Sequence, residues 1–532
     1  MTRRRRTLLL LALLAAVVAL ALYRLPFWSA SLLAERLSAG LNRPVTVAEI
    51  RLHALPFEAE VLGLEVGGMR PGDPPFAEIP RLSLVPSLGS IFGPRLVLSR
   101  LRLEGMKLRV HALPDAEGGG DDIPRGGGGK GGGGGELRIR RLTIEGGEFL
   151  LDHDRVPLQL DLPDVRLRLA QRRGGIMGGS LAFGPGTLQL SANPPFPLGA
   201  ELELVVEGSL ITLEKGRIRS SSGRTDLAAT GKIKIAHDPI GEFQLEGPVD
   251  LDELERHVMQ TGFGIKGDAR FKGVLSVNGP RLRVQGRMGG TNGVYDGVPV
   301  PEFDGELSWN EHGVTLTGLE LKALGGNGTL NLNVPSDSGA LAKLDARLGG
   351  VDAEGLIMPI FDIGAAGLAA AANGELAIAW PKGRIRALSG RIAVELEAKD
   401  DGRTPLRGRF EWRAEKGTQL VEKAELRTPS TNLRLEGRIE IDDRSDLAVD
   451  GESTDLAATD DLGRRLRRAL GAGDPQLAGF SGAGSFRGRW KGTLQVPVYE
   501  GRFSGNDVGY LGVVWGKAEW AGVADPYEVR SR

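Results

Sequence analysis

Hydrophobic and polar residues alternate along most of this chain from Arg43 onward. The runs at Val45 to Arg51, Arg95 to Leu103 and Leu137 to Glu145 largely alternate Leu, Ile or Val with polar residues, and Leu158 to Leu169 alternates most cleanly. Successive side chains of a β-strand point to opposite faces of a sheet, so this period of two predicts strands with one apolar and one charged face. We therefore expect a mostly β protein.

The N-terminus carries an apolar run that predicts a membrane span. Arg3 to Arg6 precede an unbroken apolar stretch from Leu8 to Leu22, and aromatic residues follow it. This pattern predicts one transmembrane helix over 7–28, with residues 1–6 in the cytoplasm and the remaining chain on the other side of the membrane. A secretory signal that is cleaved is the alternative, and the length of the apolar run disfavours it. Leucines at helical spacing then predict a short amphipathic helix just after the span.

The second half of the chain is repetitive. Gly273 recurs as Gly488, and seven further residues between 271 and 298 recur at the same offset of 215; Gly305 and Trp309 recur as Gly408 and Trp412. Together these offsets indicate a unit of about 100 residues, which is typical of structures built from stacked repeats. Each unit is predicted to begin with a short helix and to continue as strands; the three helices are expected at 251–259, 353–361 and 456–470.

A sheet with one apolar face needs a cover on that face. Composition leaves two solutions open: a closed sandwich, or a trough that receives an apolar ligand. The predicted membrane span favours a trough for lipid. Strand parity then predicts the lining as Leu158, Leu160, Leu162, Val165, Leu167, Leu169, Leu188, Leu190, Leu202, Leu204, Leu330, Leu332, Val334, Leu433, Leu435, Ile439 and Ile441. The same parity turns Gln159, Asp161, Arg166, Arg168, Asn331, Arg434 and Glu440 to water.

Composition gives no sign of catalysis. Lys and Arg total 67 against 68 Asp and Glu, so net charge gives no indication of nucleic-acid binding, and the absence of Cys excludes thiolate chemistry and disulfides. The six His lie too far apart in sequence for a local ligand pair. The Gly-rich segment 118–135 is interpreted as a flexible loop, because Lys130 is followed by Gly131 where a phosphate-binding loop needs Ser or Thr. We expect no enzyme activity, no cofactor and no metal.

A basic helix near the C-terminus leaves two interpretations open. Arg464, Arg465, Arg467 and Arg468 alternate with leucines in the predicted helix at 456–470. Such a helix can contact anionic lipid head groups, or it can be a solvated helix that caps the trough.

The order of elements resembles a known family. Basic residues and a span, a short helix, and then the segments 43–67, 74–110 and 136–169 are similar to the N-terminal part of TamB and of the wider AsmA-like group. The glycine-punctuated units downstream resemble the same family, so the likeness covers essentially the whole chain. The resemblance implies a β-taco fold, anchored in the bacterial inner membrane, whose periplasmic groove carries phospholipid to the outer membrane. The chain differs from TamB in that the sequence stops at Arg532, without the large C-terminal domain of that family.

The resulting expectation is an elongated, repetitive antiparallel sheet curved into a hydrophobic groove and preceded by one transmembrane helix. Its regions are expected at 29–117 (N-terminal β region), 118–135 (loop), 136–250 (β groove) and 251–532 (repeats). The expected partners are phospholipid, the inner membrane and a TamA-like or BamA-like outer-membrane barrel. One alternative function is a scaffold for assembly of outer-membrane β-barrel proteins or autotransporters; another is an inert stalk.

Overall fold

The structure is a computed structural model that describes most of the chain from residue 29 onward. The described residues are 29–54, 57–68, 72–87, 97–112, 138–153, 158–190, 193–235, 239–279, 281–295, 297–337, 339–361, 363–382, 384, 387–415, 418–439, 445–471, 473, 476–493, 497–510, 512–525 and 529–531. The predicted membrane span at 7–28 and the Gly-rich loop at 118–135 lie outside these residues.

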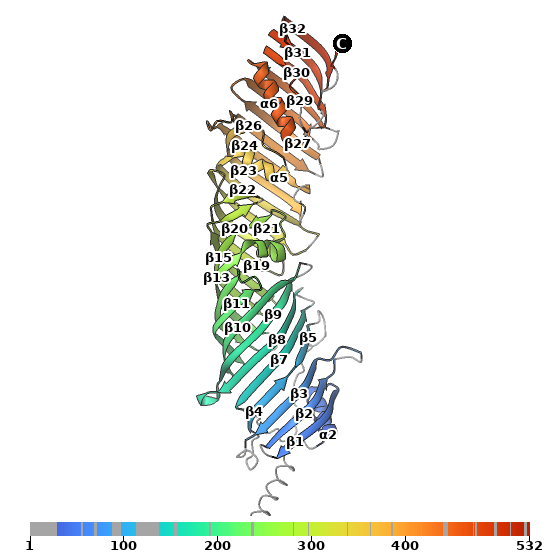
Figure 1. Ribbon diagram of the computed structural model, residues 1–532, viewed down its shortest axis with the longest axis vertical. Helices are drawn as coiled ribbons and strands as arrows, with labels where there is room; N and C mark the ends of the chain where they lie inside the picture. The colour runs from blue at the N-terminus through green and yellow to red at the C-terminus, as the bar shows by residue number, and fades with distance from the viewer. Residues whose placement is uncertain are drawn as a thin grey trace, which may run out of the picture. The chain divides into compact units, whose positions relative to one another are not determined.

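The chain is mostly β and forms two compact units. The first comprises residues 1–249 and 272–284, and the second comprises residues 250–271 and 285–532. Each unit contains a long, predominantly antiparallel sheet whose strands follow one another in the order of the sequence (Figure 1). The predicted β class is therefore confirmed, and each unit is described separately below.

The first unit begins with a helix that covers the start of its sheet. Helix α2 (Ala30–Leu41) begins at Ser29, whose hydroxyl accepts a hydrogen bond from the backbone N–H of Leu32 at 3.5 Å. The expected amphipathic helix is therefore present. Its Leu33 is buried in one hydrophobic cluster with Val61 and Leu98, which are 0% and 3% exposed. The first strands are thus closed by a packed core.

The sheet of the first unit is antiparallel except at one place. Its strands are β1 (Val45–Ala54), β2 (Phe57–Val66), β3 (Ala77–Pro86), β4 (Val97–Glu104), β5 (Lys107–Ala112), β6 (Arg138–Ile139), β7 (Arg141–His153), β8 (Leu158–Gln171), β9 (Met177–Leu190), β10 (Phe196–Glu207), β11 (Leu210–Ser220), β12 (Asp226–Lys234) and β13 (Ile240–Asp250), with a 3-10 turn η1 (Arg173–Gly175) between β8 and β9. Strands β4 and β5 pair with β7 in parallel. Parallel neighbours need a connection of a dozen or more residues, and the Gly-rich stretch lies in the connection between β5 and β6.

The sheet of the second unit is built by consecutive antiparallel neighbours. Its long strands are β19 (Glu302–Asn310), β20 (Gly313–Ala323), β21 (Gly326–Pro335), β22 (Leu341–Asp352), β23 (Leu368–Pro381), β24 (Ser389–Ala398), β26 (Arg407–Glu415), β27 (Thr418–Arg427), β28 (Thr431–Ile439), β29 (Ser445–Ser453), β30 (Phe480–Gly492), β31 (Pro497–Tyr510) and β32 (Val513–Ala524), followed by β33 (Val529–Ser531). Short strands are β14 (Ile265–Lys266), β17 (Gly293–Tyr295), β18 (Val298–Val300) and β25 (Thr404–Pro405). Strands β15 (Asp268–Asn278) and β16 (Arg281–Gly290) contain residues of both units.

Three helices interrupt the second unit at the positions that the repeat predicts. They are α4 (Leu251–Leu254), which continues into the π-helical turn η2 (Glu255–Met259), α5 (Ala353–Phe361) and α6 (Leu456–Ala469). Each begins after an aspartate that accepts a hydrogen bond from a helical N–H group: Asp250 from Asp252 and Glu253, Asp352 from Gly355, and Asp455 from Ala457 and Ala458. Because Asp is among the strongest N-cap residues, one residue type at one place explains where all three helices start.

Strand register supports the repeat at single-residue resolution. Ile265 pairs with Tyr295, and the residues 215 positions further on, Phe480 and Tyr510, also pair. Tyr295 pairs with Val298 just as Tyr510 pairs with Val513. The repeated residues therefore occupy equivalent places in equivalent hairpins.

Candidate functional site: the apolar face of the sheet

The predicted parity of β8 is reproduced by burial. Leu160, Leu162, Val165, Leu167 and Leu169 are half-buried, whereas Gln159, Asp161, Arg166 and Arg168 are exposed. The parity changes between Leu162 and Val165 because the register of β8 against β7 shifts there, at an Asp164 with a φ of 51°. Such a bulge adds a residue and returns the next apolar side chain to the same face.

Neighbouring strands extend these side chains into rows across the first unit. Ile144 of β7 pairs with Leu167 of β8, Leu167 pairs with Leu181 of β9, and Leu181 pairs with Leu202 of β10. All four side chains are half-buried. Leu151, Leu160 and Leu188 form a second row in the same way. The leucines predicted for this face are therefore brought together, and Ile144 and Leu181 complete the rows although the sequence analysis did not name them.

Burial in β20 to β22 distinguishes the ends of these strands from their middle. Leu332 and Val334 of β21 are 3% and 2% exposed, so these two predicted lining residues are enclosed by protein. Val351, near the end of β22 and beside the beginning of β21, is 2% exposed. Between the two ends, Leu319, which pairs with Leu330, and Leu330 itself are only half-buried. The apolar face of β20 to β22 therefore has covered ends and a partly open middle.

The segment after α4 packs on the buried end of β23. Trp380 is 0% exposed, its indole N–H donates a hydrogen bond to the carbonyl oxygen of Thr261 at 3.0 Å, and its ring lies 4.8 Å from that of Phe263. Phe263 also packs edge-on against Tyr295, with ring centroids 5.3 Å apart. Residues 251–264 thus pack on the apolar face through their contacts with the buried Trp380.

A carboxylate holds the turn of this segment. Glu255 accepts hydrogen bonds from the Thr261 hydroxyl at 2.8 Å and from the Gly262 N–H at 2.9 Å. Burial raises the pKa of Glu255 above its ordinary value, and these donors offset only part of that rise. Burial also lowers the pKa of the nearby Lys382. The turn is therefore held by the carboxyl group of Glu255, whose charged form is disfavoured by burial.

Helix α6 is held against the connection that follows α5. Arg465 donates hydrogen bonds to the carbonyl oxygens of Ala366 and Gly367 at 2.6 and 3.2 Å and to the Thr404 hydroxyl at 2.8 Å. Asp461 accepts from both Arg464 and Arg465. Arg464 and Arg465 therefore serve intramolecular contacts rather than a solvated surface.

The C-terminal strands carry an aromatic row that the sequence analysis missed. Phe486 pairs with Phe503, and Phe503 pairs with Trp520, so the three side chains share one face of β30 to β32. A Cβ at Gly488 or Gly501 would lie 2.8 or 2.9 Å from the Phe486 ring, which therefore covers these glycines. Because glycines replace the aliphatic residues here, the Leu, Ile and Val alternation is lost; the signal would have been alternation of aromatic residues with glycine.

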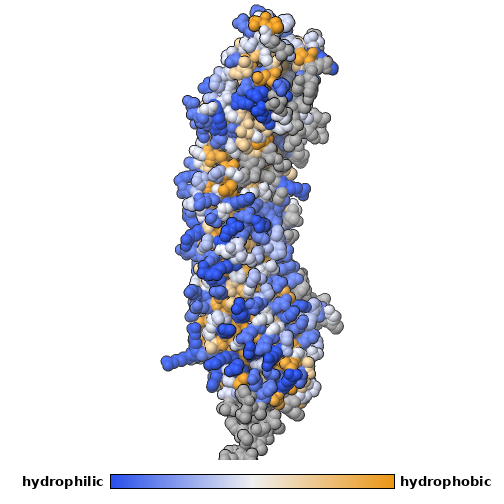
Figure 2. All heavy atoms as spheres, in the orientation of Figure 1, coloured by the Kyte–Doolittle hydropathy of each residue, from blue (hydrophilic) through white to orange (hydrophobic). Residues whose placement is uncertain are grey.

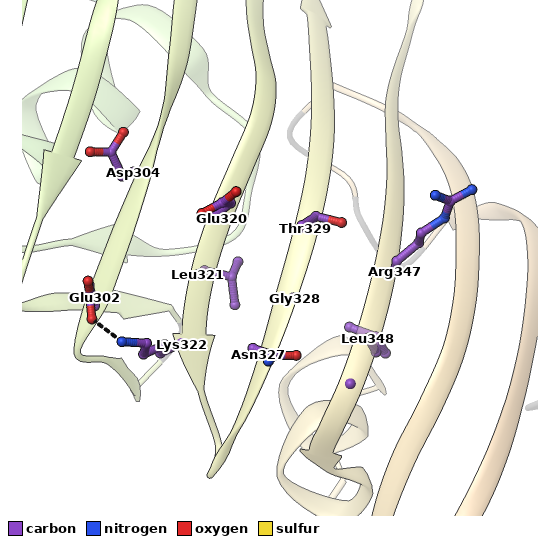
Figure 3. A pocket seen from close by; sticks show the side chains of 11 residues that line it. Glu302, Asp304, Glu320, Leu321, Lys322, Asn327, Gly328, Thr329, Arg347 and Leu348 are labelled. Atoms are coloured by element: carbon purple, nitrogen blue, oxygen red, sulfur yellow. Dashed lines mark hydrogen bonds and ion pairs between the residues drawn. The ribbon is translucent and has the colours of Figure 1, made fainter.

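The opposite face carries cross-strand ion pairs. Arg489 donates to Asp446 at 2.7 Å, and this contact lowers the pKa of the aspartate. A hollow of about 460 Å³ on this side is lined by Glu302, Asp304, Glu320, Leu321, Lys322, Asn327, Gly328, Thr329, Arg347, Leu348 and Gly349 (Figure 3). Its Lys322 and Glu302 are paired at 2.6 Å. Hydrophilic residues likewise dominate the view in Figure 2, where hydrophobic residues form separate patches.

Several predicted features fall outside what the structure describes. These are the side chains of Leu158 and Leu190 and the whole of Glu440 and Ile441. Of the remaining lining residues, Leu188, Leu204, Leu433, Leu435 and Ile439 are half-buried, and Asn331 and Arg434 are exposed. Within the described ranges no helix has the length and apolar character needed to cross a membrane, and no three His, Asp or Glu residues gather to hold a metal.

Comparisons of the chain with models of protein families, with curated proteins and with solved structures gave no match. The arguments about function therefore rest on the apolar face itself.

Proposed function

We propose that this chain is an AsmA-like, TamB-type protein, anchored in the bacterial inner membrane, that conducts phospholipid through the periplasm along its apolar sheet face. The observation that carries the proposal is the set of half-buried aliphatic rows, such as Ile144, Leu167, Leu181 and Leu202, opposite a face of exposed polar and charged residues. Monomeric proteins rarely leave contiguous apolar surface without a partner.

The energetics favour a lipid as that partner. Exposing an acyl chain to water costs about 0.8 kcal/mol per CH₂ group, so a two-tailed lipid faces a barrier on the order of 20 kcal/mol outside a membrane. A continuous apolar lining removes most of that cost without chemistry or cofactor. Covered strand ends, as in β20 to β22, would act as walls that keep the tails on the middle of the face.

Site-specific photo-crosslinking tests the proposal directly. A photoreactive phenylalanine analogue at Leu167 or Leu330, in the full chain expressed in its membrane, should capture phospholipid that mass spectrometry identifies. The same analogue at Arg166 or Asn333, which are exposed, is the matched control and should capture little. Equal capture on both faces, or none at Leu167 and Leu330, contradicts the proposal.

One observation favours the second candidate, a scaffold for outer-membrane β-barrel proteins. Strand β32 pairs with β33 only from Gly522 to Ala524, so among the described residues the rest of this edge is unpaired. Near the start of β32, Val513, Val514 and Trp515 are 54%, 73% and 66% exposed. An exposed edge beside apolar side chains can accept a strand from another protein. Loss of barrel proteins with an unchanged lipid balance in a deletion strain would favour this function over lipid conduction.

A further inference from the structure

Six exposed arginines gather at one end of the strands β6 to β8 in the first unit. Arg141 begins β7, and it pairs with Ala170 near the end of β8. The backbone N–H of Gln171 donates a hydrogen bond to the carbonyl oxygen of Arg140 at 2.7 Å, which places the two strand ends side by side. The six residues, named here the arginine end, are Arg138, Arg140, Arg141, Arg168, Arg172 and Arg173.

The arginine end carries an excess of positive charge. Arg172 lies 3.8 Å from Glu214, but among the described residues no carboxylate forms an ion pair with Arg140, Arg141, Arg168 or Arg173. Some other arginines of the polar face are paired across strands, as Arg217 is with Asp226. Unneutralised guanidinium groups at one place indicate an anionic partner.

The start of α2 lies toward the same end of the first unit. Helix α2 packs along β1 and is joined to it by residues 42–44 only, so helix and strand run in opposite directions. Strand β1 runs from Val45 to Ala54, and its end lies at the side where β2 begins. Pairing through β3 places the beginning of β4 on that side, and Leu98 of β4 pairs with Ile139, the neighbour of Arg140. The predicted membrane span immediately precedes α2.

We infer that the arginine end is the surface of the first unit that contacts the anionic head groups of the membrane. The inference rests on the proposed function, specifically on the membrane anchor before Ser29. Arginines close to an anionic bilayer each strengthen the association by roughly fivefold. The contact would also bring the half-buried Leu167 and Leu169, at the same end of β8, next to the layer from which lipid enters. A lipid surface fits better than a nucleic acid because the predicted membrane span precedes α2, and α2 starts toward the arginine end.

A pair of glutamines on one strand allows a direct test. The chain has no cysteine, so Gln171→Cys and Gln159→Cys each create a single labelling site. Both glutamines are exposed and lie on β8, twelve residues and about 40 Å apart. The full chain would be reconstituted in bilayers containing phosphatidylglycerol and a quencher attached to head groups. We expect at least a fivefold stronger quenching of a fluorophore at Gln171 than at Gln159.

Charge reversal separates charge from position. Changing Arg140, Arg141, Arg168 and Arg173 to Glu should abolish the difference between the two labels. The matched control reverses four exposed arginines elsewhere, Arg283, Arg407, Arg427 and Arg434, and should leave the difference intact.

Three results would overturn the inference. They are equal or stronger quenching at Gln159, an unchanged difference after reversal at the arginine end, and protection of the Gln171 label by added RNA but not by anionic lipid. A chain that inserts and captures lipid at Leu167, yet fails these tests, refutes the arginine end alone. A chain that does not insert at all refutes the anchor and, with it, both proposals.

Discussion

Replacing Leu332 by Arg should unfold the second unit, whereas replacing Leu330 by Arg should not. Both leucines lie on the apolar face of β21, but Leu332 is 3% exposed and Leu330 is half-buried beside Leu319. At Leu332 the change removes about 1.5–3 kcal/mol of leucine burial and leaves a charge without a partner, which costs several kcal/mol more. At Leu330 the arginine stem can cover the face while the guanidinium reaches water, so we expect a loss of about 1 kcal/mol.

The control for this pair follows from a hydrogen bond that sequence parity does not reveal. Asn331 is exposed, yet its side-chain oxygen accepts a hydrogen bond from the N–H of Gly318 at 2.8 Å, in a bulge where Gly318 has a φ of 57°. Asn331→Arg would therefore disturb β20. Asn333 is also exposed and has no such contact among the described residues, so Asn333→Arg is the silent control.

Urea unfolding of the detergent-solubilised full chain, followed by far-UV circular dichroism, measures the three variants together. Hydrogen exchange of β20 to β22 then localises the change to the second unit. If Leu332→Arg is as stable as Asn333→Arg, Leu332 is not enclosed as described. If Leu330→Arg unfolds as Leu332→Arg does, the middle of the face is closed and the trough is refuted.

Three further predictions concern the contacts around the apolar face. Trp380→Ala should lower the free energy of unfolding by about 3–5 kcal/mol, measured by urea denaturation, because a fully buried ring is lost together with its hydrogen bond to Thr261. Glu255 has a raised folded-state pKa, so its contribution to stability is present below its ordinary pKa near 4.5 and is lost as pH rises through the folded value. Glu255→Gln should therefore make the urea midpoint less dependent on pH over this range. Asp446 has a lowered pKa, so its contribution to stability is present above about 3.8 and lost as pH falls, and Arg489→Gln should reduce that acid dependence because Arg489 is its largest cause.

Much of the fold could be predicted from local patterns. Alternation over Leu158 to Leu169 identified both faces of β8, because burial on one face imposes the period of two on the sequence. The three helices of the second unit were predicted by offset, and each proves to follow an aspartate cap. The alternation and the aspartate caps are local signals, whereas the repeat offset compares segments about 100 residues apart.

Features that depend on distant residues could not be predicted in this way. Parity assigns Leu332 and Leu330 to one face, but cannot show that only Leu332 is enclosed. The parallel pairing of β4 with β7 is likewise absent from the pattern, since alternation specifies which face a side chain occupies and not which strand lies beside it. Neither interpretation of α6, as a helix that contacts lipid head groups or as a solvated helix that caps the trough, anticipated the hydrogen bonds of Arg465 to a connection about 100 residues earlier.

The placement of the covering elements explains how a stable sheet can leave apolar surface for a ligand. A sheet that gains its stability by packing face to face against a second sheet must bury the middle of its apolar face. In β21 and β22, the buried Val334 and Val351 lie toward the two ends of the strands, and the half-buried Leu330 lies between them. Because an aspartate-capped helix recurs in each repeat, every repeat supplies buried contacts of its own. Over β20 to β22 these contacts add stability without closing the middle of the face. In β27 to β29, by contrast, a buried cluster of Val421, Ala424, Leu447 and Val449 lies in the middle of the strands, so any path for lipid along the face has to pass beside this cluster.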